Sequence, residues 1–272
     1  MPPIRPTKSI LPRDLGTALA ALRERAPLVQ CLTNIVVANF TANVLLAAGA
    51  SPAMVDNPAE AESFAGIAGG VLINLGTPYP DTTEAMAAAI RGAEANHTAW
   101  VLDPVAVGAL RWRTSLAHQF LRGHQPSIVR GNASEILALA GGAGGKGVES
   151  LASVEQAHGA AATLAAAHHT VVAVSGAVDY LTDGTRSVRI ANGHLYLTRI
   201  TGSGCALGGL MAGFAAVVDD ALCAAAAATA TLTVAADIAA KRARGPGSFA
   251  VALLDSLCDL TPGALVDTVC LP

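Results

Sequence analysis

The sequence predicts an α/β fold built on a mostly parallel sheet with helices on both faces. Short apolar runs that could each form one buried strand alternate with segments of helical periodicity along most of the chain. Helices of about ten residues or more between strands are the connections that right-handed parallel crossovers need. With 272 residues and 52% hydrophobic composition, the chain can bury both faces of such a sheet.

The first half of the chain supplies the regular part of this pattern. Asp14 can cap a first helix that Pro27 ends. Gly49 closes the second helix, and Pro58 stands at the start of the third. We expect strands at residues 28–34, 52–55, 71–75 and 99–103, and helices at 14–25, 37–48, 58–68 and 81–95.

The second half continues the alternation and then departs from it. Strands are expected at residues 127–130 and 171–175, and helices at 114–121, 133–140 and 154–168. After an Asp183-Gly184 turn, the runs 187–190 and 195–198 alternate in period two around residues 191–193. This pattern predicts a β-hairpin at one edge of the sheet.

Composition and charge exclude several classes of function. The net charge is −3 without a basic run, which disfavours a nucleic-acid surface. Five cysteines without CxxC spacing, and histidines without HxxxH or HExxH spacing, indicate neither a disulfide framework nor a zinc site. We expect four of the five cysteines to be inert core residues. The N-terminus lacks the apolar segment of a secretory signal, which predicts a cytoplasmic protein.

The alanine-rich segment 221–236 is long and uncharged enough to raise a membrane helix as an alternative. Asp219, Asp220 and Asp237 bracket it, and alanine contributes little to membrane insertion. The segment therefore favours a helix buried in the core of the protein.

The turn Thr201-Gly202-Ser203-Gly204-Cys205 leads directly into an apolar helical run. Two glycines let the backbone approach a ligand closely, and the following helix points its unpaired amide groups into the turn. The same helix dipole would favour the thiolate of Cys205 and lower its pKa toward neutrality. A phosphate cradle beside a polarised thiol suggests phosphoryl transfer, whereas the alternative is a glycine-rich helix start with a buried cysteine.

Candidate ligand-binding residues, polar except for Met54, end the predicted strands, where an open parallel sheet binds its ligands. They are Asn34, Met54, Asp103, Arg130 with Asn132 and Glu135, and Ser175. The carboxylates of Asp103 and Glu135 suit Mg²⁺ through bound waters, and Arg130 suits phosphate oxygens. Each has a structural alternative: Asp103 precedes Pro104 and could only form a turn, and Glu135 could only be an acid at a helix start.

A second glycine-rich stretch, Gly141 to Gly147, is not a P-loop. Its Lys146 is followed by glycine instead of serine or threonine, and no strand precedes it. We expect a mobile surface loop.

With these residues assembled, the sequence closely resembles the hydroxyethylthiazole kinases of thiamine salvage, which belong to the ribokinase-like superfamily. The stretches that carry the resemblance are 27–34, 41–54, 102–109, 130–135 and the turn ending at Cys205. Cysteine at the end of this turn is typical of the thiazole kinases, whereas related sugar kinases have an aspartate base there. Ser175 stands where the family usually has threonine, which keeps the hydroxyl.

The resemblance implies a three-layer ribokinase-like fold over residues 1–272 as a single kinase domain, with residues 1–12 as a loose extension. It implies the following site: Cys205 as the catalytic residue, Met54, Gly202 and Asn34 at the substrate, Arg130, Ser175 and Gly204 at ATP, and Asp103 and Glu135 near Mg²⁺. It also implies a homotrimer whose active sites lie between subunits, so that Met54 and Cys205 of one site come from different chains.

The implied reaction is ATP-dependent phosphorylation of the hydroxyl of 4-methyl-5-(2-hydroxyethyl)thiazole. Two alternatives remain at this point: another ribokinase-like kinase for hydroxymethylpyrimidine or a sugar, and a non-catalytic protein that binds a thiazole or a nucleotide.

Overall fold

The computed structural model describes residues 9–141 and 154–272, and in this part of the chain the strands form one eight-stranded sheet. The strand order is β2-β1-β3-β4-β5-β6-β7-β8. In chain order, the strands are β1 (Leu28–Leu32), β2 (Ser51–Ala53), β3 (Gly70–Asn74), β4 (Ala99–Asp103), β5 (Ile128–Asn132), β6 (Val171–Ser175), β7 (Asp179–Thr182) and β8 (Ser187–Ile190). All pairings from β2 to β6 are parallel, and β7 and β8 add antiparallel to that edge. The predicted parallel sheet is confirmed.

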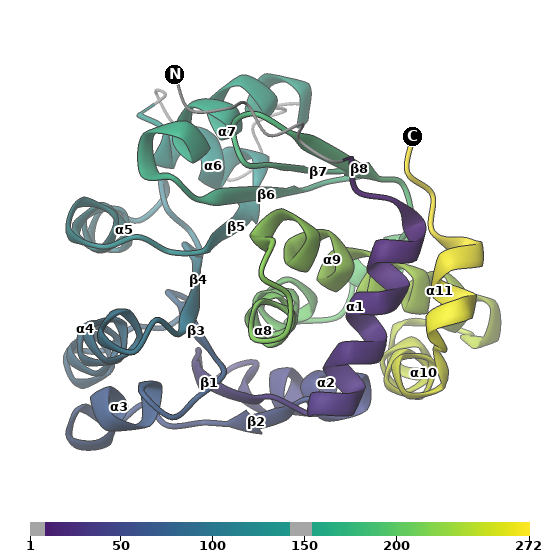
Figure 1. Cartoon of the computed structure of the whole chain (residues 1–272), viewed down its shortest axis with the longest axis horizontal. Coiled ribbons are helices and arrows are strands. Elements are labelled where there is room, and N and C mark those ends of the chain that lie inside the picture. The colour runs from purple at the N-terminus through teal and green to yellow at the C-terminus, as the bar shows by residue number, and fades with distance from the viewer. Residues whose placement is uncertain (1–8, 142–153) are drawn as a thin grey trace.

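Helices cover both faces of the sheet and complete three layers (Figure 1). One face carries α3 (Pro58–Ala65), α4 (Pro80–Ala95), α5 (Arg111–Gly123), α6 (Ala133–Leu139) and α7 (Val154–His168). The other carries α1 (Pro12–Arg25), α2 (Ala38–Ala48), α8 (Ser203–Ala215), α9 (Ala221–Arg242), α10 (Pro246–Asp259) and α11 (Pro262–Thr268). The α/β layering predicted from the sequence is therefore present.

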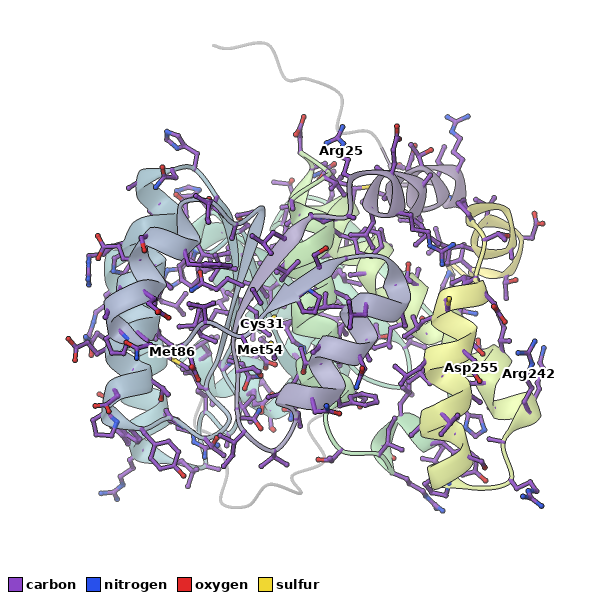
Figure 2. The ribbon with its side chains drawn as sticks, turned by 90° about the horizontal axis from the view of Figure 1, so that it is seen from below. Arg25, Cys31, Met54, Met86, Arg242 and Asp255 are labelled. Carbon is purple, nitrogen blue, oxygen red and sulfur yellow. The ribbon has the colours of Figure 1, made fainter. Side chains whose placement is uncertain are left out.

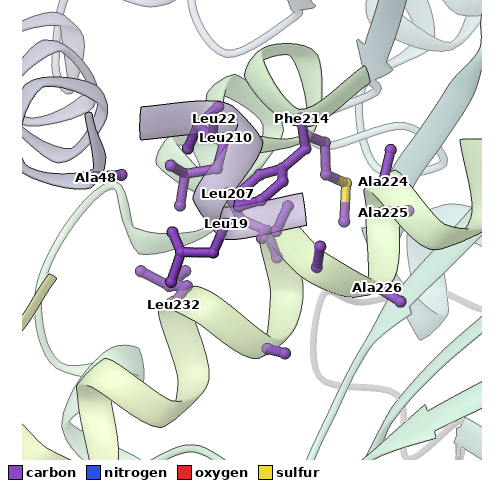
Figure 3. Packing of buried hydrophobic residues seen from close by; sticks show 14 of the residues in the cluster. Leu19, Leu22, Ala48, Leu207, Leu210, Phe214, Ala224, Ala225, Ala226 and Leu232 are labelled. Carbon is purple, nitrogen blue, oxygen red and sulfur yellow. The ribbon is translucent and has the colours of Figure 1, made fainter. Parts of the chain in front are cut away.

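Helix α8 lies against the centre of the sheet because small residues line its inner side. A Cβ at Gly208 would be 2.9 Å from the side chain of Leu72 on β3. On its outer side, Phe214 and Leu210 pack with Leu19 and Leu22 of α1 in a dry cluster (Figure 3). This packing holds the first turn of α8 above the carboxyl ends of the central strands.

The alanine-rich helix α9 is a core helix, as expected. Among the described residues it is the one single helix long and apolar enough to cross a membrane, but 83% of its apolar window is buried inside the protein. Helix α10 and helix α1 pack against it, and Asp220 caps its first turn by accepting from the amides of Leu222 and Cys223. Burial in this layer accounts for its hydrophobicity.

The prediction of a β-hairpin at the edge of the sheet is confirmed, but one of its two predicted strands is wrong. Ser187–Ile190 is β8, but it pairs with β7 across the Asp183-Gly184 turn, where Asp183 Oδ1 accepts from the amide of Arg186. The run Leu195–Thr198 is a 3₁₀ helix (η1) and not a strand. His194 caps this 3₁₀ helix by accepting from the amide of Tyr196, and the ring of Tyr196 packs on Phe249 of α10. Because of these contacts, the segment packs against α10 instead of pairing with the sheet.

Other boundaries shift by a few residues. Helix α5 begins at Arg111, three residues before the expected start, and α1 begins at Pro12, which suits the first position of a helix. The glycine-rich stretch from 141 to 147 lies, after Gly141, outside the described residues.

Candidate active site

The turn before α8 is held by a backbone that requires glycine. Gly202, the N-cap residue, has a φ of 92°, and a Cβ there would be 2.7 Å from Val37 Cγ1. Ser203 Oγ is turned back to donate to the carbonyl of Leu197 at 2.8 Å. No side chain caps the first turn in the described structure, so its amide groups face the open end of the sheet. The arrangement is suited to an anion, as the sequence predicts.

Cys205 lies in this first turn and is partly exposed. Asn34 Nδ2, just after β1, donates to its sulfur at 3.5 Å. Burial raises the pKa of the thiol, and the charge of Asp103 raises it further, whereas the charge of Arg130 and hydrogen bonds from the side chains of Asn74 and Asn34 lower it. The expectation of a thiolate near neutral pH is therefore wrong, because burial and the charge of Asp103 outweigh the groups that lower the pKa.

A chain of hydrogen bonds leads from Cys205 into the sheet. Asn34 Nδ2 also donates to Asn74 Oδ1 at 2.9 Å, and Asn74 Nδ2 donates to Asp103 Oδ2 at 2.7 Å. Asn34 follows β1, whereas Asn74 and Asp103 end β3 and β4, and all three side chains are buried. Asn74 was missed in the sequence, although it is the polar end of an otherwise apolar strand, the same signal that identified Asp103.

Arg130 on β5 lies beneath the turn and links Asp103 at the end of β4 to Ser175 at the end of β6. Its Nη1 is 3.4 Å from both carboxylate oxygens of Asp103, and its Nη2 donates to Ser175 Oγ at 2.9 Å. Burial lowers the pKa of the guanidinium, but the charges of Asp103 and Glu135 outweigh this and raise it. Arg130 Nε is buried without a partner among the described residues. The guanidinium is a fixed cation, and each of its two terminal nitrogens has a second N–H group besides the one directed at Asp103 or Ser175.

The two predicted metal-binding carboxylates, Asp103 and Glu135, interact electrostatically with each other but have different hydrogen-bond partners. Asp103 is fully buried, and burial raises its pKa to about 6, against the attraction of Arg130 and with a contribution from the charge of Glu135. Glu135 Oε2 accepts from the amide of Asn132 at 2.9 Å, a capping box at the start of α6, and its Oε1 accepts from the amide of Ala106 at 2.9 Å. The structural alternative for Glu135, an acid at a helix start, is therefore also present.

Mg²⁺ fits this pair of carboxylates when it is carried by phosphates. Among the described residues, no group of three His, Cys, Asp or Glu side chains could hold a metal ion by itself. Mg²⁺ needs few protein ligands, since it keeps several waters and binds phosphate oxygens. The charge of Glu135 raises the pKa of Asp103, which means that a cation between the two would relieve their repulsion.

Met54 is not brought to this cluster within one chain. It follows the edge strand β2, where the register pairs Gln30 with Ala53, and Figure 2 shows it beside Cys31 of β1. Its side chain is 39% exposed. Met54 therefore lies on the outer surface of the protein.

Asp179 is a second residue that the sequence reading missed. It begins β7, and its Oδ1 accepts from the amide of Gly176 at 3.0 Å, which fixes the turn that follows Ser175. Burial raises its pKa to about 6, whereas that amide and the charge of Arg130 lower it. A carboxylate at the start of a short strand, a few residues after Ser175, is the signal that could have found it.

The expectation that the other four cysteines are inert core residues is correct for two of them and wrong for two. Cys31 and Cys223 are buried, and burial raises the pKa of Cys31 to about 12, which makes it inert. Cys258 and Cys270 are exposed, because they lie on outward sides of the C-terminal segment.

The parallel sheet, the glycine turn opening α8 and the arginine–aspartate pair beneath it define a kinase of the ribokinase-like class. A ribokinase-like superfamily protein from Enterococcus faecalis has the same fold, with a TM-score of 0.64 at 13% identity over 94% of this chain and 90% of its own.

A model of the hydroxyethylthiazole kinase family matches residues 19–263, and the chain belongs to this family. A hydroxyethylthiazole kinase from Clavibacter sepedonicus is 58% identical over 96% of both chains. The structure of a hydroxyethylthiazole kinase from Pyrococcus horikoshii superposes with a TM-score of 0.87 at 39% identity, covering 95% of this chain and 98% of that one.

Proposed function

We propose that this protein transfers the γ-phosphoryl group of ATP to the hydroxyl of 4-methyl-5-(2-hydroxyethyl)thiazole, a reaction of thiamine salvage. The observation that carries this proposal is the position of Cys205 in the uncapped first turn of α8, directly above Arg130 and beside Asn34. The membership of the chain in the hydroxyethylthiazole kinase family supports the choice of acceptor. It also disfavours the pyrimidine, sugar and non-catalytic alternatives.

The nucleotide phosphates bind at the glycine turn and on the cation below it. The amides of Ser203, Gly204 and Cys205 receive the transferred group, and Arg130 donates to its oxygens. Ser175, already held by Arg130, lies at the end of β6 and donates its hydroxyl to the same phosphates. Fixed donors of this kind supply most of what phosphoryl transfer needs, because the transition state is loose.

Mg²⁺ bound to the phosphates would be held by Asp103 and Glu135 through water molecules. The ion would neutralise charge that develops on the phosphoryl oxygens. Asp103 is already turned toward Arg130 and Asn74, so its carboxylate has a fixed orientation before any ligand binds.

Cys205 acts as a thiol that orients the acceptor hydroxyl. Its raised pKa excludes a resting thiolate as the main form at neutral pH. The sulfur accepts from Asn34, which leaves its other side for the alcohol. The backbone of Gly202, at the start of the same turn, contacts the thiazole ring. Little proton transfer is needed before the loose transition state, so a weak hydrogen-bond acceptor is sufficient to orient the alcohol. The hydroxyl proton passes to an oxygen of the transferred phosphoryl group as the new bond forms and ADP leaves.

The assembly is proposed to be a cytoplasmic homotrimer in which Met54 completes the site of a neighbouring subunit. Apolar side chains are exposed around β1, α2 and β2: Ile35 is 72% exposed, Val36 61%, Leu46 60% and Met54 39%. A surface of this kind is typical of an interface. Light scattering during gel filtration should give a trimer mass that falls in Ile35→Asp, and a monomeric wild-type protein would contradict the assembly.

The test of the activity is an ADP-release assay with three acceptors in parallel. The purified protein, with ATP and Mg²⁺, should release ADP with the thiazole alcohol and much more slowly with hydroxymethylpyrimidine or ribose. Equal rates with the pyrimidine alcohol would favour the alternative kinase. Absence of ADP release with every acceptor would favour a binding protein.

A further inference from the structure

The side chain of Asn74 has an orientation that its neighbours fix at both ends. Its Nδ2 donates to Asp103 Oδ2, and its Oδ1 accepts from the backbone amide of Gly76 at 3.0 Å. A backbone amide can only donate, and the carboxylate of Asp103 accepts. If the side-chain amide of Asn74 were reversed, its NH₂ would face the N–H of Gly76 and its oxygen would face the carboxylate, and both hydrogen bonds would be lost. Asn74 is 1% exposed, so water cannot replace either partner.

This fixed orientation determines which end of Asn34 faces Cys205. Asn74 Oδ1 accepts from Asn34, so the group of Asn34 that lies there is its NH₂. The same nitrogen is 3.5 Å from Cys205 Sγ and donates to it. A Cβ at position 76 would collide with the Asn34 side chain, so the missing side chain of Gly76 makes room for this arrangement.

We propose that Asn74 is a positioning residue for phosphoryl transfer: through Asn34, and with its own side-chain amide, it keeps N–H groups directed at Cys205 Sγ and so holds the sulfur toward the acceptor alcohol. The proposal rests on the role of Cys205 stated under the proposed function. Asn74 itself touches neither substrate nor nucleotide in this arrangement. It links the carboxylate that faces the phosphates to the sulfur that faces the alcohol.

Steady-state kinetics of Asn74→Ala and Asn74→Ser test this link. Each should lower kcat by about tenfold or more, the scale of one lost hydrogen bond in a buried network, with a much smaller change in KM for ATP. In an Asn34→Ala background, Asn74→Ala should cause a smaller loss than in the wild-type background, because Asn74 acts partly through Asn34 and partly through its own hydrogen bond to Cys205. Full additivity of the two losses, or an unchanged kcat in Asn74→Ser, would overturn the proposal.

A second measurement follows the ionisation of the Cys205 thiol directly. In a background in which exposed Cys258 and Cys270 are replaced by serine, iodoacetamide should react with Cys205, since Cys31 and Cys223 are buried. The midpoint of the pH profile of alkylation should rise in Asn74→Ala, because a hydrogen bond to the sulfur favours its charged form. An unchanged midpoint would overturn the proposal, and this readout requires no catalysis.

The matched control is Asn192→Ala. Asn192 also bridges separate segments, donating to Asp237 Oδ2 and the carbonyl of Thr268 and accepting from the amide of Cys270. Its replacement should lower the melting temperature and leave kcat and the alkylation midpoint unchanged. The proposed function fails separately if Cys205→Ala retains full kcat, whereas the inference alone fails if Cys205→Ala is impaired and the Asn74 variants are not.

Discussion

The guanidinium of Arg130 lies against the backbone of Gly204, so closely that a Cβ at position 204 would be 2.8 Å from Nη1 and 3.3 Å from Nη2. One helical turn later, a Cβ at Gly208 would be 3.5 Å from Asp103 Oδ2. The side of α8 that faces the sheet therefore has no side chains where the charged pair lies. This absence lets the amides of the first turn and the buried cation act on one phosphate.

Gly204→Ala should displace Arg130 and impair ATP use while the protein stays folded. The new methyl group must push the guanidinium away, and the far end of an arginine can move at low cost in stability. We expect KM for ATP to rise by about tenfold or more, since a charge-assisted hydrogen bond contributes about 1.5–3 kcal/mol. Gly159→Ala on α7 is the control, because nothing lies within 4 Å of the added Cβ. It should leave KM unchanged and stabilise the helix by about 0.5–1 kcal/mol.

Arg130→Ala should raise the ATP requirement more than it lowers the affinity for the thiazole. The substitution removes a donor to the phosphates and leaves Asp103 buried without its cation, at 0% exposure. Loss of one partner of a buried pair costs about 3–5 kcal/mol of stability. Adding Asp103→Asn should recover part of the stability but none of the activity. Steady-state kinetics and urea unfolding check both effects, and an unchanged KM for ATP would contradict the nucleotide assignment.

Cys205→Asp should give an active enzyme, in contrast with Cys205→Ala. Aspartate can accept a hydrogen bond from the alcohol and from Asn34, whose Nδ2 now faces the sulfur. Alanine can accept neither, so its kcat should fall. The ADP-release assay compares the two, with circular dichroism to confirm folding. A folded Cys205→Asp protein without activity would count heavily against the orienting role.

The clustering of most candidate site residues could be predicted because these residues lie at strand ends. Arg130 and Asp103 follow apolar runs that the sequence marks clearly, and adjacent parallel strands bring such ends together. The pKa of Cys205 was predicted wrongly, because helix position is visible in a sequence whereas burial at the centre of a sheet is not. The strand assigned to 195–198 failed for a similar reason, since the packing of Tyr196 on Phe249 joins segments far apart in the chain.

Glu135→Gln should increase the Mg²⁺ concentration needed for half-maximal rate. Both carboxylate oxygens accept from backbone amides, so a glutamine NH₂ must face one of these donors and the negative charge near Asp103 is lost. Activity titrated with Mg²⁺ at fixed ATP measures the effect, and excess EDTA should abolish activity in every variant.

Glu94→Gln is the matched control for that titration. Glu94 also uses both oxygens, accepting from the amide of Gln125 and pairing with His124. Its replacement should affect stability and leave the Mg²⁺ dependence unchanged. An equal shift in both variants would show that the effect at Glu135 is structural.

Asp179→Asn should change the dependence of stability on pH. Burial raises the pKa of Asp179 from 3.8 to about 6, so the folded protein binds this proton more tightly than the unfolded chain. The contribution of Asp179 to the free energy of unfolding is therefore fully present below about pH 4 and is lost as the pH rises to about 6. Asparagine keeps the acceptor for Gly176 and does not ionise. Relative to wild type, the variant should gain up to about 3 kcal/mol between these limits.

Asp183→Asn should show the opposite dependence and so serves as the comparison. Burial raises the pKa of Asp183, but hydrogen bonds from Arg186 and Thr185 outweigh it and lower the pKa to about 2. Its stabilising contribution is present above about pH 4 and is lost as the pH falls toward 2. Urea unfolding of wild type and both variants between pH 3 and pH 7 separates the two cases. A stability difference between Asp179→Asn and wild type that stayed constant across that range would show that the pKa of Asp179 is not raised. It would also contradict the conclusion that the turn after Ser175 holds a buried carboxylate that interacts with the charge of Arg130.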